Sequence, residues 1–214
     1  ANAYADPDSA YFRAPAYLQK DFYFPYDQGF QFVKRLYDRG GWAEVDDAFK
    51  NPPVSTEMIL HPEKYDSGEA SQIVAAPVLT DTLSADWRQI DTNVMGEWYT
   101  SLILEQQVDE GDAVEAAAGW GGDRYTVSFN ESADQTVVAW HIVWDTTGDA
   151  EEFIDAFQQY GDARFGGSAK IGEGSLCWLG GSTCLYFTPQ ATLWIFAPDA
   201  ATLEKMRQAV DFQQ

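Results

Sequence analysis

The stretch Tyr125–Trp144, YTVSFNESADQTVVAWHIVW, decides the fold of this chain. It contains two runs in which bulky residues occupy every second position, and five mostly polar residues, 130–134, separate the runs. Alternation with a period of two is typical of a strand with one buried face, and the polar residues favour a turn. The stretch therefore predicts an antiparallel hairpin with one bulky face. The bulky positions are Tyr125, Val127, Phe129, Val138, Trp140, Ile142 and Trp144.

The chain downstream of this hairpin continues with strand-like runs and two helices. Asp149-x-x-Glu152 has the form of a capping box, which predicts the start of the first helix. Asp199 predicts the N-terminal cap of the second helix. We therefore expect residues 121–214 to form an antiparallel sheet of about five strands packed with two helices. The strand-like runs that follow the hairpin lie around Ile171, from Leu176 to Phe187 and from Thr192 to Ala197.

The chain upstream of the hairpin has helical patterns instead. Gly29, Phe32, Val33 and Leu36 recur at helical spacing and would share one face, and Gly40-Gly41 predicts the end of that helix. We expect a helical part over residues 26–120, which forms either a separate unit or one continuous domain with the sheet. Residues 1–25 are rich in Ala, Asp, Pro and Tyr and predict an extended N-terminal arm. The chain is thus expected to be an α+β protein.

Composition and charge exclude several classes of function. The 214 residues include 34 acidic and 13 basic side chains, which give a formal net charge of −21. Because phosphate contacts dominate binding to nucleic acids and anionic lipids, both would be repelled. No apolar run approaches the roughly 18 residues that cross a bilayer. The acidity suits calcium, salt-rich surroundings or simply a hydrated exterior.

Cys177 and Cys184 are the two cysteines of the chain, and they flank a stretch with two glycines and a serine. Such a stretch favours a tight turn, and a hairpin brings the flanking side chains within disulfide distance. We predict a disulfide and an oxidising location, extracellular or at the cell surface. The chain begins at Ala1, as removal of a signal peptide or a fragment boundary would leave it. The alternative is two reduced, packed thiols in a cytosolic protein.

Motifs of hydrolytic enzymes are absent from the sequence. It contains no H-E-x-x-H helix, no G-x-S-x-G turn and no phosphate-binding glycine loop, so we assign no catalytic residue and no cofactor. His61 and Glu63 are the candidate ligands for a cation such as zinc or calcium. In the alternative, His61 bonds to the backbone, and Glu63 pairs with Lys64 or Arg35. Asn130 begins an N-x-S sequon and is a candidate glycosylation site.

Two further features have both a binding and a structural interpretation. The glycine-rich residues 119–122 precede a strand-like run, so we interpret them as a tight corner rather than a phosphate cradle. The eight tryptophans would suit a carbohydrate-stacking platform. Their periodic placement favours the core, with Trp140 and Trp144 between sheet and helix and Trp42 and Trp98 among the helices.

Several blocks of the sequence resemble blocks of one known family. They are Phe30–Tyr37, Gly40–Trp42, Pro52–Tyr65, Ala116–Tyr125 and Trp144–Phe153. Over about residues 26 to 165 they are similar, in order, to a poorly characterised family of secreted, metallopeptidase-like proteins. The resemblance implies the downstream, non-catalytic region of a zincin-like enzyme. The H-E-x-x-H helix of that family is missing here. In the family, a glutamate in a Glu-Gly-Asp-Ala string upstream of these blocks is the third zinc ligand. Here Glu110-Gly111-Asp112-Ala113 follows the Pro52–Tyr65 block instead of preceding it, so no ligand role carries over to Glu110.

These observations predict a non-catalytic secreted or cell-surface protein. We expect it to act by protein contact, either with copies of itself or with another surface component, and the arm over residues 1–25 would help to join subunits. One alternative is the C-terminal part of a zinc metallopeptidase whose metal-binding part lies outside this chain. A second alternative is a carbohydrate-binding module.

Overall fold

The computed structural model describes residues 9–79, 82–210 and 212. The chain divides into two compact units, Ala1–Ala70 and Ser71–Gln214. The boundary thus lies well before the predicted one at residue 120. The reason is that residues of the two helices preceding the hairpin belong to the same core cluster as the sheet residues.

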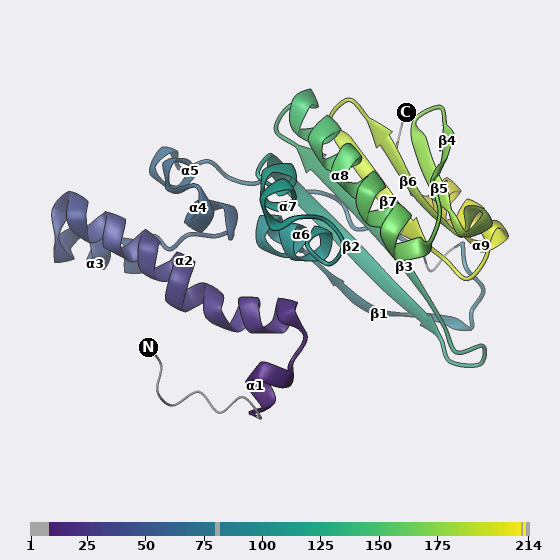
Figure 1. The fold of residues 1–214 in the computed structure, drawn as a ribbon, viewed down its shortest axis with the longest axis horizontal. Helices are drawn as coiled ribbons and strands as arrows, with labels where there is room; N and C mark the ends of the chain where they lie inside the picture. Colours follow the sequence, from purple (N-terminus) through teal and green to yellow (C-terminus); the bar gives the residue numbers. More distant parts are fainter. Residues whose placement is uncertain (1–8, 80–81, 211, 213–214) are drawn as a thin grey trace. The chain divides into compact units, whose positions relative to one another are not determined.

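The first unit is helical in its described residues (Figure 1). Its small core consists of Phe32, Leu36 and Val45, with Ile59 and Tyr65 packed against them. As predicted, the long helix ends at Gly40, and the following glycine has a φ of 67°. The helices are α1 Ala10–Arg13, α2 Ala16–Gly40, α3 Trp42–Lys50, α4 Glu57–Leu60 and α5 Pro62–Ser67.

The predicted N-terminal arm differs from the structure. Residues 1–8 lie outside the described residues, and from Ala16 onward the chain is α-helix rather than extended. Pro25 lies inside α2. Proline lacks an amide hydrogen, so it removes one hydrogen bond from this helix. Good helix formers in residues 16–20 carry the helix upstream of it.

The second unit contains the sheet, and the α+β class is confirmed. Its described residues form one antiparallel sheet of seven strands in the order β1-β2-β3-β7-β6-β5-β4, two more strands than expected. The hairpin of residues 125–144 is present as β2 and β3, with Tyr125 opposite Trp140. The elements are β1 Trp87–Asn93, α6 Gly96–Leu104, α7 Glu110–Ala117, β2 Trp120–Asn130, β3 Gln135–Trp144, α8 Thr147–Phe165, β4 Lys170–Gly172, β5 Ser175–Trp178, β6 Thr183–Thr188, β7 Ala191–Phe196 and α9 Ala200–Ala209.

Helices cover both faces of this sheet (Figure 1). On one face Trp140 and Trp144 of β3 pack against Phe153 of α8, and α6 and α7 extend the same layer. On the other face Ala139 of β3 packs in a cluster with Met206 of α9. Both sides of β3 are therefore buried. The bulky side carries the tryptophans, and the small side is closed by α9.

Of the two predicted helix caps in this unit, the structure corrects one and confirms the other. The helix α8 begins at Thr147, and its capping box joins Thr146 to Asp149 instead of Asp149 to Glu152. The Thr146 side chain accepts a hydrogen bond from the amide of Asp149, whose carboxylate accepts one from the amide of Thr146. The cap predicted for α9 is confirmed, since Asp199 accepts a bond of 2.7 Å from the amide of Thr202.

Candidate functional site

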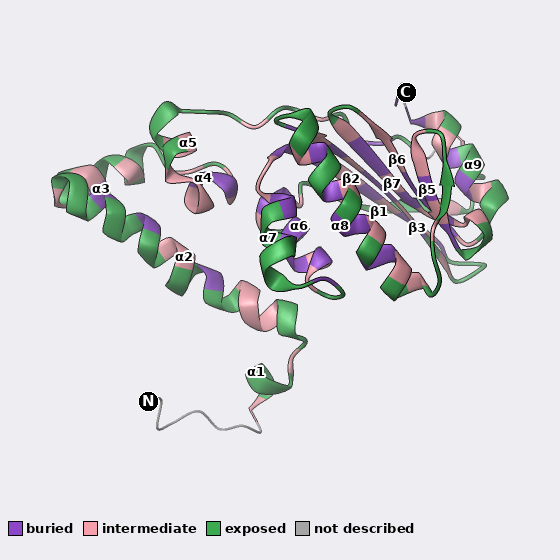
Figure 2. Ribbon diagram, turned by 45° about the horizontal axis from the view of Figure 1, so that its top comes forward, coloured by how far each residue is buried: buried purple, intermediate pink, exposed green. Residues whose placement is uncertain are grey.

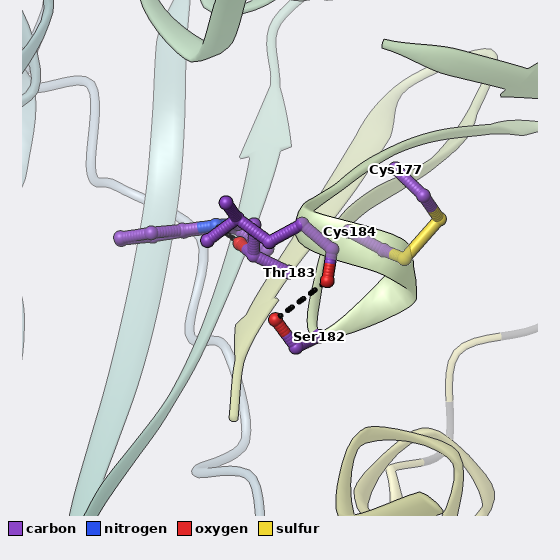
Figure 3. The surroundings of a disulfide bond; sticks show 6 residues. Cys177, Ser182, Thr183 and Cys184 are labelled. Atoms are coloured by element: carbon purple, nitrogen blue, oxygen red, sulfur yellow. Dashed lines mark hydrogen bonds between the residues drawn. A yellow bond between two sulfur atoms is a disulfide. The ribbon is translucent and has the colours of Figure 1, made fainter. Parts of the chain in front are cut away.

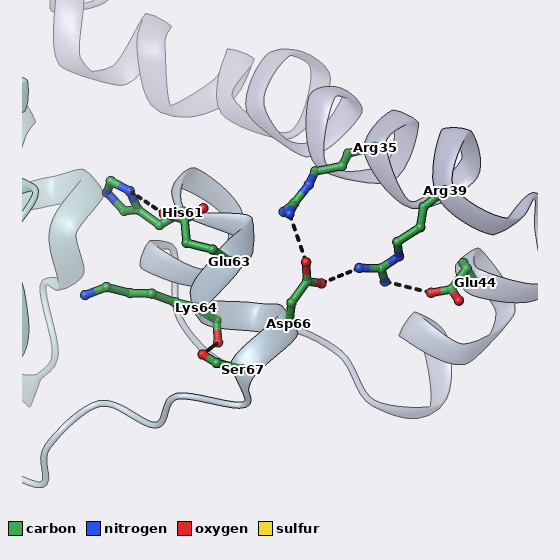
Figure 4. Close-up of polar contacts among 8 residues, drawn as sticks. All are labelled: Arg35, Arg39, Glu44, His61, Glu63, Lys64, Asp66 and Ser67. Carbon is green, nitrogen blue, oxygen red and sulfur yellow. Dashed lines mark hydrogen bonds and ion pairs between the residues drawn. The ribbon is translucent and has the colours of Figure 1, made fainter.

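The candidate metal ligands His61 and Glu63 lie at the start of α5, and they do come together (Figure 4). Nδ1 of His61 is 3.5 Å from Oε1 of Glu63, whose side chain is 71% exposed. This gives one histidine and one solvated carboxylate, whereas a structural zinc site uses four protein ligands. The pair therefore offers two of the donors such a site needs.

The ion pairs around His61 and Glu63 differ from the expected pairing of Glu63 with Lys64 or Arg35. Lys64 contacts Glu57 instead of Glu63, and Arg35 contacts Asp66 at 2.8 Å. Figure 4 shows that Asp66 also accepts a hydrogen bond from Arg39.

Arg39 is the residue that ties this network to the next helix. Its guanidinium bonds to Asp66 of α5 at 2.6 Å and to Glu44 of α3 at 2.7 Å. These bonds raise the pKa of Arg39 above its already high ordinary value. The network holds α2, α3 and α5 together, so we interpret it as structural.

Asp123 is a buried carboxylate of β2 that the sequence analysis did not single out. It accepts hydrogen bonds from the amides of Met95 and Gly96, at 2.9 and 2.8 Å, and from the indoles of Trp120 and Trp140, each at 2.9 Å. Burial raises its pKa above the ordinary value, and the four donors oppose that rise. Both oxygens are used in capping the start of α6 and fixing the two indoles, which is a structural task.

The glycine-rich stretch before Asp123 is a close backbone approach, in line with its interpretation as a corner. The amide of Gln72 donates to the carbonyl of Gly121 at 2.7 Å. A Cβ on Gly122 would lie 2.4 Å from the carbonyl oxygen of Gln72. The glycines let the segment around Gln72 run directly against β2, and no helix begins there to hold a phosphate.

The predicted disulfide is confirmed (Figure 3). Cys177 of β5 lies directly opposite Cys184 of β6, with 4.1 Å between their Cα atoms. Between them the chain turns through Leu179–Gly181, and the Ser182 hydroxyl donates to the Leu179 carbonyl at 3.2 Å. The crosslink is compatible with an oxidising compartment.

The candidate glycosylation site lies in a closed hairpin turn. Asn130 is 7% exposed, and its side-chain oxygen accepts hydrogen bonds from the Ser132 hydroxyl and the Ala133 amide, at 2.8 and 3.0 Å. The folded turn therefore shields this amide, and attachment of a sugar would have to precede folding.

The tryptophans are divided between core and surface. Trp140 and Trp144 lie in the sheet core as predicted, together with Trp120 and Trp178. The prediction for Trp42 was wrong, since it is 69% exposed at the start of α3. The helical spacing of Trp42, Val45 and Phe49 predicts that these residues share one face of the helix. It does not show whether another element covers that face.

The most unusual surface of the described residues lies along α2. Five residues with spacings of three and four form one exposed face, which we call the aromatic stripe: Tyr23, Tyr26, Phe30, Val33 and Tyr37. Each is between 43% and 76% exposed, whereas the opposite face of α2 buries Phe24, Phe32 and Leu36. Figure 2 shows α2 exposed along most of its length, with short buried bands. Trp42 continues the surface, because its ring meets that of Tyr37 at 5.1 Å.

The sequence analysis missed the aromatic stripe, although a signal for it was present. It placed Val33 with the inward residues around Phe32, while Val33 is exposed. The spacing from Tyr23 to Tyr37 already forms a second apolar face on the same helix. A helix with two apolar faces has more apolar surface than one neighbour covers.

A family model described as a domain of unknown function, DUF8575, matches residues 82–207. The chain belongs to this family. The match covers the sheet and its helices, and α1–α5 with the aromatic stripe lie before it. Neither a curated protein nor a solved structure matches the chain. In the described residues, no helix is long and apolar enough to span a membrane.

Proposed function

We propose that this DUF8575 protein is a non-catalytic secreted or cell-surface protein that acts by binding another protein through the aromatic stripe. The stripe spans fifteen residues of α2, or roughly 22 Å at the helical rise. Single exposed apolar residues are normal on protein surfaces, but a contiguous patch marks a contact site. Tyrosine, phenylalanine and tryptophan are also the residues most enriched at protein interfaces.

Charge favours a protein over a lipid surface as the occupant of the stripe. The chain carries a net charge of −21, which opposes approach to an anionic membrane. The side chains of the stripe are uncharged, so their burial against a partner removes apolar surface from water and is favourable in free energy. A protein surface with apolar side chains meets that requirement without bringing phosphate groups near the acids.

The polar groups of the chain support a non-catalytic role. Asp123 directs both oxygens to four internal donors, and His61 contacts the exposed carboxylate of Glu63. A catalytic base needs an open hydrogen-bond direction toward a substrate. The disulfide, together with the resemblance to secreted proteins, supports placing the molecule outside the cytoplasm.

Site-specific photocrosslinking tests the binding surface. A photoreactive phenylalanine is placed at position 30 of the full chain in the cells that produce it, and at position 31 as the matched control. Gln31 is exposed on the same helix but lies off the stripe. We expect protein adducts from position 30 and few from position 31. Equal labelling from both positions, or none, would contradict the proposal.

A metal and activity assay tests the non-catalytic part. We expect the purified chain to hold zinc well below one ion per molecule and to leave unstructured peptides intact. Stoichiometric zinc together with peptide hydrolysis, lost on His61→Ala, would instead support the metallopeptidase alternative.

A further inference from the structure

We propose that the partner of the aromatic stripe is the same stripe of a second copy, with the two α2 helices running antiparallel. This inference rests on the proposed function and names its partner. It follows from three observations: the spacing of the stripe, the order of charges along its border and the distribution of charge between the two units.

The spacing of the stripe is that of a two-helix seam. From Tyr23 to Tyr37 the intervals are three, four, three and four residues, which is the repeat that places side chains between those of a facing helix. The opposite face of α2 is already used, since Phe32 and Leu36 pack with Val45 of α3. The stripe is thus a second seam on the same helix, and it has the geometry to receive another helix.

The charges beside the stripe select the direction of that helix. Lys20, Asp27 and Lys34 follow one another at seven-residue intervals along one border, so their charges alternate. In an antiparallel pair a border faces the same border of the other helix. Asp27 of each copy then lies beside Lys34 of the other, which gives two opposite-charge pairs. A parallel pair would place this border against the opposite border of the second helix, which lacks charged residues.

The opposite border consists of Phe22 and Gly29, and the next position in the repeat, Leu36, is already buried in the core of the first unit. Charged side chains set against these residues would lose water without gaining a partner. The antiparallel arrangement avoids that cost at Lys34, because Lys34 of each copy meets the carboxylate of Asp27. The border therefore complements itself only when the second copy is reversed.

The charge of the whole chain also favours contact through this unit. Residues 1–70 contain twelve acidic and seven basic side chains, whereas residues 71–214 contain twenty-two and six. Two copies that met through their sheets would bring the more strongly acidic units together. Contact through α2 joins the less negative units. A seam of this length is at the small end of interface sizes, so we expect a dissociation constant on the order of 1–100 μM.

Sedimentation equilibrium of the full chain over 1–500 μM tests the proposal. We expect a monomer–dimer equilibrium, and Phe30→Glu should weaken it at least tenfold because it places two carboxylates in the seam. Gln31→Glu is the matched control and should leave it unchanged. Circular dichroism of both variants shows whether α2 is retained. A dimer insensitive to Phe30→Glu overturns the proposal.

Charge reversal tests the direction. Asp27→Lys sets like charges together in the antiparallel dimer, and so does Lys34→Asp, so each should raise the dissociation constant about fivefold. The double variant exchanges the charges and should restore wild-type affinity. Lys34 also bonds to Asp38 within its own helix. The bond to Asp38 is absent from both Lys34→Asp and the double variant. A recovery of affinity in the double variant therefore reports on the contact between the two copies alone. Failure of the double variant to recover overturns the antiparallel arrangement.

Photocrosslinking at position 30 separates this proposal from the proposed function. An adduct of twice the chain mass supports both. An adduct with a different protein, from a chain that stays monomeric at 500 μM, overturns the self-pairing and leaves the binding function standing. A link confined within one chain, or no adduct at all, overturns both.

Discussion

Asp123 shows how one buried carboxylate fixes several elements at once. Its four donors come from the start of α6 and from the indoles of Trp120 and Trp140. In Asp123→Asn an amide group would face donors in place of an oxygen, so we expect a loss of about 3 kcal/mol in the free energy of unfolding. Urea denaturation measures the loss. The control Glu131→Gln, at an exposed turn, should change stability by less than about 0.5 kcal/mol.

His141 gives the stability of the chain a dependence on pH. Burial lowers its pKa below the ordinary value of 6.5, and its ring packs edge-on against Phe212 at 5.3 Å. The unfolded chain therefore binds a proton more readily than the folded one. Stability contributed by the neutral ring is present above pH 6.5 and is lost as the pH falls toward the lower folded pKa. Arg124, opposite it on β2, adds no anion to offset the proton.

We therefore expect the urea midpoint of the wild type to fall between pH 7.5 and pH 5.5, and the fall to be smaller in His141→Gln. His61→Gln serves as the comparison, because it leaves His141 in place and should keep the wild-type fall. The same decline in His141→Gln as in the wild type would contradict this account.

The hairpin of β5 and β6 depends on its crosslink more than the central strands do. Cys177 and Cys184 are seven residues apart, and closing a loop of this size stabilises a fold by about 2–3 kcal/mol. We expect Cys177→Ser/Cys184→Ser to lower the unfolding free energy by that amount. Added dithiothreitol should destabilise the wild type similarly and leave the double variant unchanged. A reductant effect of equal size on both proteins would trace the loss to another cause.

The elements that the sequence predicted well are those specified by their own residues. The hairpin β2–β3 has alternation and a polar turn within twenty residues, so its pairing is local. The strand β1 was missed, because most of Trp87–Asn93 is exposed and polar, and its partner strand lies more than thirty residues away. Tertiary pairing, rather than local pattern, makes it a strand.

The candidate site shows the same division. The disulfide was predictable, because two cysteines around a turn of glycines leave few other arrangements. The aromatic stripe was not, because periodicity states which residues share a face, and only the packing of the other elements decides whether that face is covered. Asp123 was missed for a related reason, as its donors lie up to 28 residues away in the chain.

Uneven charge makes the stability of the whole molecule depend on salt. The net charge is −21, and most of the excess lies in residues 71–214. Repulsion among these acids opposes the compact state, and salt screens it. We expect the melting temperature to rise by several degrees between 0.05 and 1 M sodium chloride. Glu115→Gln/Glu152→Gln, which removes two exposed charges, should melt higher at low salt and respond less to added salt.

The two ends of the sheet limit what the protein can become at high concentration. At one end β4 is only three residues long and carries Lys170; at the other, β1 is bent by a bulge between Gln89 and Asp91. Short, charged or bulged outer strands are poor templates for the addition of further strands. Crowded molecules should therefore form small closed particles instead of fibrils, and thioflavin T should stay dark even in millimolar solutions.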